Sequence, residues 1–439
     1  MNRLRSLFLL LFLLLALVAC GGDQTAPEVT VPEEEMLPTP TLAVEPPAAT
    51  LPPPVVEEAE ESQVDDSVVE EEAPEPVVEE PAGAWPADAF GYGIQIHGNA
   101  TVGDPGQTMD AVRNQLGLDW VKMQVQWWLV EPSPDEDQWF FYDGVIDEAH
   151  ARGLRLMVSA VGAPAWTRAA GTENGPPDDY TQYANFLVEM LNRHPGKIDA
   201  IEVWNEQNLD REWTTANGIS PEDYVEFLRI AYEAIKSVDP DIIVISGALA
   251  PTGDGDWVSW ADDFAYLDRA LAAGMLNYAD CVGVHHNGYN IGPDVTFDQA
   301  GATAEAATAV FRGPFDNPHH SWSFKTTLDT YAAKVQAIDP DMKLCVTEFG
   351  WASSEGYDSV PTGFEFARDN TLQEQAEYIV QAFQQMQSSG DVWLAFLFNF
   401  DFGNKGSGPM DDPVPYSIVD VNGVPRPAFG AIAEMEKVP

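Results

Sequence analysis

The chain has 439 residues and a formal net charge of −50 at pH 7. So large a negative charge argues against nucleic acids and anionic polymers as partners and is compatible with neutral ligands. Its three cysteines are too few for a disulfide scaffold, and their spacing matches no metal site.

Residues 1–20 are expected to direct export. Two arginines precede an apolar run over 7–18, which has the length of a signal-peptide core and is short for a membrane span. The run ends in Leu17-Val18-Ala19-Cys20, which resembles the processing site of bacterial lipoprotein precursors. The resemblance implies a lipid on Cys20 and a protein anchored to the membrane at the bacterial cell surface. A plain secretory signal and an uncleaved anchor are the alternatives, and both also export the chain.

Residues 21–84 are expected to form a disordered linker. They contain no Lys, Arg, Trp, Tyr or Phe and consist mainly of Pro, Glu, Val, Ala and Thr. Such a segment buries too little apolar surface to offset its ordering entropy, and its prolines and like charges favour an extended tether. It holds 18 acidic and no basic residues, which leaves residues 85–439 with 53 acidic and 19 basic residues and a net charge of −34.

Residues 85–439 alternate short apolar runs with amphipathic helical patterns. The expected strands are 93–97, 120–126, 155–160, 200–204, 242–247, 281–285, 343–347 and 392–398. The expected helices are 108–116, 143–151, 180–193, 221–237, 262–273, 323–338, 373–388 and 427–437. This alternation predicts parallel β-α-β units, and eight of them predict an α/β protein with a single (β/α)8 TIM-barrel domain. An open doubly wound sheet is the alternative, but residues 91–99 lack the helix-opening GxGxxG that would follow its first strand.

Polar and aromatic side chains collect where the expected strands end, at the edge of a TIM barrel that carries active sites. The two acidic ones that we single out are Glu206, in Ile201-Glu-Val-Trp-Asn-Glu206, and Glu348, in Leu344-Cys-Val-Thr-Glu348. The residues expected to bind substrate at this edge are Asn205, His97, Gln126, Trp128, Trp166, His286, Tyr289, Trp351 and Asn399.

Asn205-Glu206 after the fourth expected strand and Glu348 after the seventh resemble the signature of clan A glycoside hydrolases. These are retaining (β/α)8 enzymes that include cellulase-like and β-xylosidase-like families, and the resemblance covers residues 85–439. It implies that Glu206 is the general acid/base, Glu348 the nucleophile and Asn205 a contact of the sugar 2-hydroxyl. It also implies cleavage of O-glycosidic bonds in extracellular poly- or oligosaccharide, with no cofactor and no metal.

The physical requirements of a retaining mechanism agree with these roles. The two carboxyl groups must lie about 5 to 5.5 Å apart, one ionised to attack the anomeric carbon and one protonated to assist the leaving oxygen. Mutual repulsion keeps one of the two protonated, and its proton can leave once the covalent intermediate removes the other charge.

Neighbours of the two glutamates also carry expectations. We expect His286 or Tyr289 to hydrogen-bond the nucleophile, whereas the adjacent His285 is expected to bind backbone at the rim. Glu202 is expected to be structural and to lie deep in the barrel. Lys122 stands where many clan members place an arginine near the nucleophile, so its contribution to charge balance is open.

Tryptophans are candidates for stacking on sugar rings, with core packing as the alternative for each. Trp166 and Trp351 are favoured because each is expected beyond the end of a strand. Trp128, Trp204 and Trp213 are further candidates.

Two departures from the clan pattern concern sugar binding. Gln207 replaces a frequent proline, and Asn399-Phe400-Asp401 stands where many members carry a tryptophan at the end of strand eight. The long segments 287–322 and 352–371 are expected to be functional loops that wall a cleft or close a pocket.

Some alternatives stay open. Cys281 and Cys345 fall on neighbouring expected strands, where we expect buried thiols, with a disulfide as the alternative. A carbohydrate-binding lipoprotein on a degenerate barrel would bind glycan without cutting it. A metal-dependent barrel hydrolase would need converging His and Asp ligands, of which the first strand offers only His97.

Overall fold

The computed structural model describes residues 83–134, 136–172 and 174–438. The expected signal with Cys20 and the expected linker up to residue 82 lie outside these residues. Within the described part, no helix has both the length and the apolar character needed to cross a membrane.

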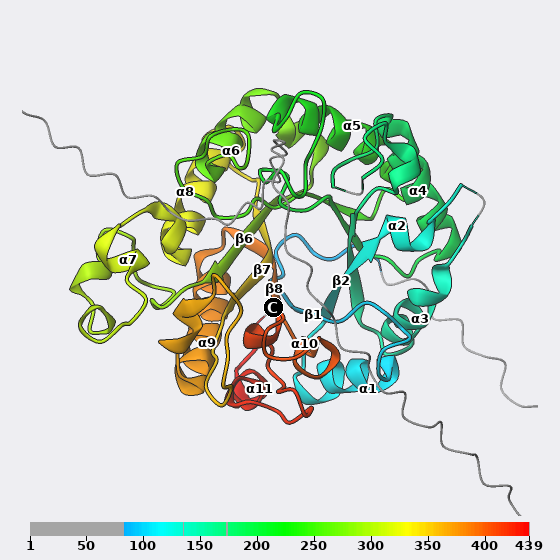
Figure 1. Cartoon of the computed structure of the whole chain (residues 1–439). Coiled ribbons are helices and arrows are strands. Elements are labelled where there is room, and N and C mark those ends of the chain that lie inside the picture. The colour runs from blue at the N-terminus through cyan, green and yellow to red at the C-terminus, as the bar shows by residue number, and fades with distance from the viewer. Residues whose placement is uncertain (1–82, 135, 173, 439) are drawn as a thin grey trace, which may run out of the picture. The chain divides into compact units, whose positions relative to one another are not determined.

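Eight parallel strands form one sheet that curls into a nearly closed barrel (Figure 1). Neighbouring strands follow the order β5-β4-β3-β2-β1-β8-β7-β6. Isolated bridges from Ile245 to Cys281 and from Leu249 to Val284 join β5 to β6 across the remaining seam. The predicted (β/α)8 TIM barrel is therefore confirmed. The strands are β1 Gly91–Gln95, β2 Trp120–Gln126, β3 Arg155–Val161, β4 Ala200–Val203, β5 Ile243–Ser246, β6 Val282–Gly288, β7 Leu344–Trp351 and β8 Val392–Leu397.

The longer helices pack around the outside of the barrel (Figure 1). Their apolar stripes repeat with the helical period, so their bounds agree with expectation to within a few residues. The single-turn helices α2, α7 and α10 are not predicted, because one turn has no hydrophobic period to read. The α-helices are α1 Pro105–Asp110, α2 Trp127–Val130, α3 Asp143–Ala151, α4 Tyr180–Arg193, α5 Pro221–Val238, α6 Asp263–Ala272, α7 Gly313–Asp316, α8 Phe324–Gln336, α9 Leu372–Ser389, α10 Phe402–Lys405 and α11 Pro427–Glu434.

Capping residues determine where helices begin and end, which the hydrophobic period predicts only to within a few residues. The Ser220 hydroxyl caps α5 by accepting a hydrogen bond from Asp223 N. Thr371 and Glu374 form a capping box at the start of α9, and Gly390 ends this helix with φ of 74°.

Strands β6 and β7 continue further than the sequence predicts. The two strands stay paired in register from His285 opposite Glu348 to Gly288 opposite Trp351. Glu348 thus lies inside β7 instead of following it. Trp351 is part of the strand and is fully buried, with its Nε1 donating to Ile291 O at 2.9 Å. The expectation that Trp351 lies beyond its strand is wrong.

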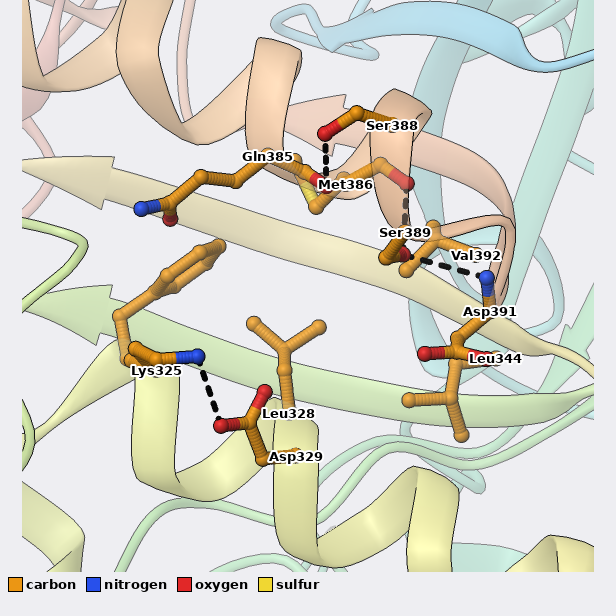
Figure 2. A pocket seen from close by; sticks show the side chains of 11 residues that line it. Lys325, Leu328, Asp329, Leu344, Gln385, Met386, Ser388, Ser389, Asp391 and Val392 are labelled. Atoms are coloured by element: carbon orange, nitrogen blue, oxygen red, sulfur yellow. Dashed lines mark hydrogen bonds and ion pairs between the residues drawn. The ribbon is translucent and has the colours of Figure 1, made fainter.

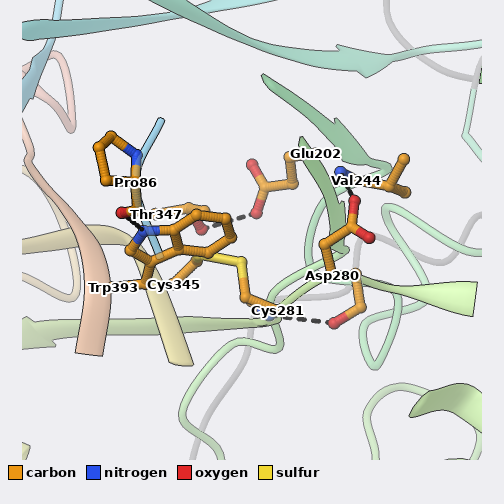
Figure 3. The surroundings of a disulfide bond; sticks show 10 residues. Pro86, Glu202, Val244, Asp280, Cys281, Cys345, Thr347 and Trp393 are labelled. Carbon is orange, nitrogen blue, oxygen red and sulfur yellow. Dashed lines mark hydrogen bonds between the residues drawn. A yellow bond between two sulfur atoms is a disulfide. The ribbon is translucent and has the colours of Figure 1, made fainter. Parts of the chain in front are cut away.

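At the N-terminal end of these strands, Cys281 and Cys345 form a disulfide (Figure 3), and their Cα atoms lie 5.8 Å apart. The expectation of two free thiols is therefore wrong. A strand pattern places the two residues on neighbouring strands, but it leaves the distance between their side chains undetermined. In the structure both belong to one buried apolar cluster with Trp120, Met157 and Phe396.

Candidate active site

Glu206 follows β4 after a sharp change in backbone direction. Trp204 and Glu206 have φ values of 75° and 46°, in the left-handed region that non-glycine residues rarely adopt. Glu206 N donates to Ala248 O at 2.9 Å, which ties this turn to the segment after β5. Backbone strain of this kind concentrates at functional sites, where the surrounding structure maintains it.

Glu348 is almost buried and is held by Lys122. The ammonium Nζ lies 2.9 Å from Glu348 Oε1, donates to Thr347 O at 3.0 Å and lies 3.5 Å from Glu202 Oε2. Lys122 is fully buried on β2. The open question of its charge balance is thus answered, because this lysine is the direct counter-ion of Glu348.

Glu202 lies fully buried below the two candidate glutamates, as expected. It accepts hydrogen bonds from Thr347 Oγ1 at 2.6 Å and from the Ser159 hydroxyl. Ala248 N also donates a hydrogen bond to Glu202 Oε1 at 3.3 Å. This carboxylate therefore has a full set of structural partners.

His285 is the side chain that the two candidate glutamates share. Its Nδ1 lies 3.3 Å from Glu206 Oε1 and 3.9 Å from Glu348 Oε2, while its Nε2 lies 3.8 Å from Glu202 Oε1. Burial lowers the pKa of His285, but the charge of Glu348 and the hydrogen bond to Glu206 outweigh burial and raise it. The expectation of a rim histidine bound to backbone is wrong.

The neighbouring His286 points away from the carboxylates. Alternate residues of a strand face opposite sides of the sheet, so His285 faces inward and His286 outward. His286 is buried with its Nε2 3.1 Å from Ser321 O, and burial lowers its pKa to about 4. This corrects the expectation for His286 as the neighbour of the nucleophile.

Glu206 has a second cationic partner in Arg211. The guanidinium Nη2 lies 2.7 Å from Glu206 Oε2, so both carboxylate oxygens of Glu206 face a positively charged or donating group. Burial raises the pKa of Glu206, but His285 first and Arg211 second bring it down to about 2. Without substrate, Glu206 is therefore ionised.

Glu212 is a third carboxyl group at this site. Burial, followed by the charges of Glu206 and Glu348, raises the pKa of Glu212 to about 7. Arg211 partly offsets this rise, since its Nε lies 3.6 Å from Glu212 Oε1. Glu212 thus retains a proton close to neutral pH.

These groups open into two adjoining cavities of about 420 Å³ and 270 Å³. Gln124, Asn205, Arg211 and Glu212 line both, so the cavities form one cleft. Residues that line only the larger cavity include Gln95, Glu206, Asn287, Tyr289, Glu348, Phe364, Phe366, Phe398, Phe402, Asp412 and Tyr416. Residues that line only the smaller one include Gln126, Trp128, Asn174 and Trp204.

The cleft brings together six of the residues singled out in the sequence, namely Asn205, Glu206, Glu348, Gln126, Trp128 and Tyr289. Asn205 Oδ1 accepts a hydrogen bond from Gln124 Nε2 at 3.4 Å. Trp128 is 37% exposed in the smaller cavity, and its Nε1 donates to Gln126 Oε1 at 3.2 Å.

Five expected substrate contacts do not line either cavity, and each has another role. The ring of His97 packs against Phe402. Trp166 Nε1 donates to Glu131 O at 2.8 Å, and Asn399 Nδ2 donates to Pro413 O at 2.9 Å from a fully buried side chain. His286 and Trp351 are buried as described above, and Trp213 is also fully buried.

Sequence reasoning misses Gln95, Arg211, Glu212 and Phe398 in the cleft. Phe398 follows β8 and is joined to Asn399 by a cis peptide bond. It lines the larger cavity close to where the clan pattern has a tryptophan, so an aromatic ring is present there after all. Its place as the last residue of an expected strand was a usable signal, whereas Arg211 and Glu212 lie in an irregular loop that carries none.

One group of possible metal ligands occurs among the described residues, formed by Asp262, His319 and His320. His320 Nε2 lies 2.9 Å from Asp262 Oδ2, and its ring stacks on Phe264. None of these residues lines the cleft, so the candidate carboxylates work apart from this group.

A separate hollow of about 260 Å³ lies between α8 and α9 (Figure 2). Lys325 and Asp329 form an ion pair of 2.8 Å at its edge. Its lining contains no residue of the cleft, which identifies it as a surface groove between two outer helices.

The barrel, with Glu206 after β4 and Glu348 in β7, has the (β/α)8 fold that glycoside hydrolases of clan A also adopt. Among solved structures, the β-glycosidase BGL167 aligns with a TM-score of 0.54 at 14% identity, covering 80% of this chain and 96% of that one. A monomeric β-xylosidase from Caulobacter crescentus aligns with a TM-score of 0.51 at 17% identity, covering 81% of this chain and 69% of that one. Xylanase 10B from Thermotoga maritima aligns with a TM-score of 0.51 at 14% identity, covering 80% of this chain and 95% of that one.

The sequence comparisons are narrower. No protein-family model matches the chain. A β-xylosidase from Geobacillus stearothermophilus is 32% identical over 99 residues, which cover 21% of this chain and 18% of that protein. The predicted resemblance to clan A barrels is thus confirmed for the fold.

Proposed function

We propose that this protein is a retaining glycoside hydrolase that cleaves the O-glycosidic bonds of extracellular poly- or oligosaccharide. The observation that carries the proposal is the shared His285, which lies within 4 Å of carboxylate oxygens from both Glu206 and Glu348 in one cleft. Two carboxyl groups on opposite sides of one bond are the machinery of glycoside cleavage.

In the proposed mechanism Glu348 is the nucleophile. Its carboxylate pairs with the ammonium of Lys122, attacks the anomeric carbon and gives a covalent glycosyl-enzyme. Glu206 protonates the leaving oxygen, and then removes a proton from the water that hydrolyses the intermediate. Asn205, next to Glu206 and lining both cavities, binds the sugar hydroxyl adjacent to the reacting carbon.

The proposed substrate is a neutral, β-linked oligosaccharide. Four carboxyl groups, Glu206, Glu212, Glu348 and Asp412, line the larger cavity and oppose anionic sugars. Phenylalanine rings there and Trp128 in the smaller cavity offer stacking surfaces on both parts of the cleft. Because several neighbours are named xylanases or β-xylosidases, xylo-oligosaccharides are the first substrates to test.

The proposed location is the outer face of a membrane. The lipoprotein-type sequence ending at Cys20 supports a lipid anchor, and residues 21–84 would hold a catalytic domain of residues 85–439 away from the bilayer. Metabolic labelling with a palmitate analogue tests this, since Cys20→Ser should abolish label incorporation.

The proposed function is tested by reducing-end release from xylans, β-glucans, mannans and galactans by residues 21–439, with Glu348→Gln as the matched variant. Release by the wild type alone, with retention of anomeric configuration by NMR, supports the proposal. Binding of one glycan by a folded protein without release would favour the alternative of a non-catalytic carbohydrate-binding lipoprotein. Activity that disappears with a chelator would favour the metal-dependent alternative.

A further inference from the structure

Glu206 is not ready to act as an acid in the substrate-free structure. A general acid needs one oxygen that carries a proton and faces the leaving group. Here Oε1 faces His285 Nδ1 at 3.3 Å and Oε2 pairs with Arg211 Nη2 at 2.7 Å. At least one of these contacts must be released before Glu206 can donate a proton.

Arg211 is the contact that can be released. Its side chain is 65% exposed, whereas that of Glu206 is 14% exposed and that of His285 is fully buried. Glu212 N and Trp213 N both donate to Leu209 O, at 3.2 and 2.9 Å, so the backbone around Arg211 is held in a turn. A change of partner by Arg211 therefore needs only side-chain rotation.

A second acidic side chain, Glu212, lies next to Arg211. Its Nε lies 3.6 Å from Glu212 Oε1, and Asp412 is a further acidic group that acts on it across the cavity. Burial and the charges of Glu206 and Glu348 raise the pKa of Glu212 to about 7, against the charges of Arg211 and His285. Arg211 thus pairs with the carboxylate of Glu206 and lies beside the carboxyl group of Glu212, which are the two partners that it can exchange.

We propose that Arg211 is a positioning residue that exchanges Glu206 for Glu212 when a sugar enters the cleft, and that the proton of Glu212 thereby passes to Glu206. The inference rests on the proposed glycosidase function and deepens it. The O–H bond of Glu212 breaks and an O–H bond forms on Glu206, while the guanidinium stays charged. The total charge of the three groups is unchanged, so the exchange takes up no proton from outside.

Because of this exchange, Glu206 carries the catalytic proton only when substrate is bound. In the free enzyme the proton needed for catalysis is held by Glu212, whose pKa is about 7, so kcat/KM falls as the pH rises through that value. Without the Glu212 carboxyl, the proton must come from Glu206 itself, whose pKa is lowered to about 2 while Arg211 pairs with it. The alkaline limb of the profile then moves toward lower pH.

The test compares Glu212→Gln and Arg211→Gln with wild type on two aryl glycosides of the sugar that the wild type cleaves, one with a good and one with a poor leaving group. We expect Glu212→Gln to lose about 10²-fold in kcat/KM on the poor leaving group and far less on the good one, since only the former needs an acid. Its alkaline limb should move down by at least one pH unit. In Arg211→Gln the alkaline limb should move the other way, to higher pH.

The matched controls are Glu233→Gln and Arg229→Gln, which break an exposed glutamate–arginine pair of 2.8 Å on α5 and should leave both substrates and the pH profile unchanged. Equal losses on both leaving groups in Glu212→Gln, or an unmoved alkaline limb, would overturn the exchange while leaving the glycosidase intact. A wild type that cleaves no glycoside contradicts the proposed function itself. Infrared titration separates the two failures. Asp263 also contributes a protonated carboxyl band near pH 6.5, so the spectra are recorded in an Asp263→Asn background. A remaining band that disappears on addition of Glu212→Gln supports the stored proton, and a band that Glu212→Gln leaves unchanged refutes it.

Discussion

Buried charge at the floor of the cleft is balanced among a few side chains. The carboxylates of Glu202, Glu206 and Glu348 lie within 4 Å of nitrogen atoms of Lys122 or His285. A carboxylate removed from water costs several kcal/mol unless a cation and hydrogen bonds compensate it. The two glutamates that we assign to catalysis therefore depend on Lys122 and His285 beside them.

Lys122→Met tests this balance. The change leaves Glu348 and Glu202 buried without their shared cation, so we expect the free energy of unfolding to fall by about 3 to 5 kcal/mol in urea titrations at pH 7. Lys325→Met is the control, because Lys325 pairs with Asp329 on the surface of α8 and should change stability by less than about 1 kcal/mol. Similar effects of the two substitutions would show that Lys122 is not a structural counter-ion.

Glu348→Ala should abolish turnover while preserving the fold. Removal of the carboxylate eliminates the attacking group but leaves space for a small anion beside Lys122. We therefore expect azide to restore activity on a substrate with a good leaving group and to yield a glycosyl azide, which mass spectrometry detects. Wild-type activity in Glu348→Ala would refute the assignment of the nucleophile.

At the scale of elements, the alternation of β6 explains which histidine reaches the cleft. The apolar run of this strand is recognisable in the sequence, but its continuation through Gly288 depends on pairing with β7, which no local pattern encodes. Consequently Glu206 and Glu348 are predictable as strand-end carboxylates, whereas the inward direction of His285 and the buried position of Trp351 are not. The loop residues Arg211 and Glu212 become visible only when the fold brings them back beside Glu206.

Helix α6 carries a buried acid that makes stability depend on pH. Burial raises the pKa of Asp263 to about 7 against the opposing charge of His320, while Tyr331 OH donates to its Oδ2 at 3.1 Å. The unfolded chain releases this proton near the ordinary value of 3.8. Between these values the folded state binds more protons, so the contribution of Asp263 to stability falls as the pH rises.

Asp263→Asn should remove this pH dependence. We expect the free energy of unfolding of the wild type to decline between pH 5 and 7 more steeply than that of the variant, by up to about 1.4 kcal/mol per pH unit. Urea titrations across this range measure the difference. Asp268→Asn alters an exposed acid on the same helix that pairs with Lys334, and its slope should match the wild type. An unchanged slope in Asp263→Asn would show that this carboxyl is ionised throughout.

The whole molecule combines an acidic chain with a neutral-ligand cleft. Residues 85–439 carry a net charge of −34, and many of the carboxylates among the described residues are exposed, where salt screens them. We expect this field to repel anionic polymers, which for the proposed glycosidase would leave stacking and hydrogen bonding to select the sugar. The composition alone predicts a preference for neutral over anionic ligands, but the cleft that would bind them forms only when the barrel is folded.

The barrel has one weak seam, and the disulfide lies beside it. β5 and β6 are joined by isolated bridges, one of which involves Cys281, whereas the other neighbouring strands pair through ladders of three or more residues. The disulfide links Cys281, at this seam, to Cys345 on β7 and closes a loop with a sequence separation of 64 residues. It therefore holds β6, the strand on one side of this seam, to β7.

Cys281→Ser combined with Cys345→Ser should destabilise the whole barrel and loosen this seam in particular. A loop of this length corresponds to a loss of about 4 kcal/mol in the free energy of unfolding, which urea titration measures. Hydrogen exchange should accelerate in β5 and β6 more than in β2 and β3, since the latter pair through all seven residues of each strand. Uniform acceleration across all eight strands would mean that the disulfide acts on the unfolded chain alone, and no loss of stability would contradict its structural role.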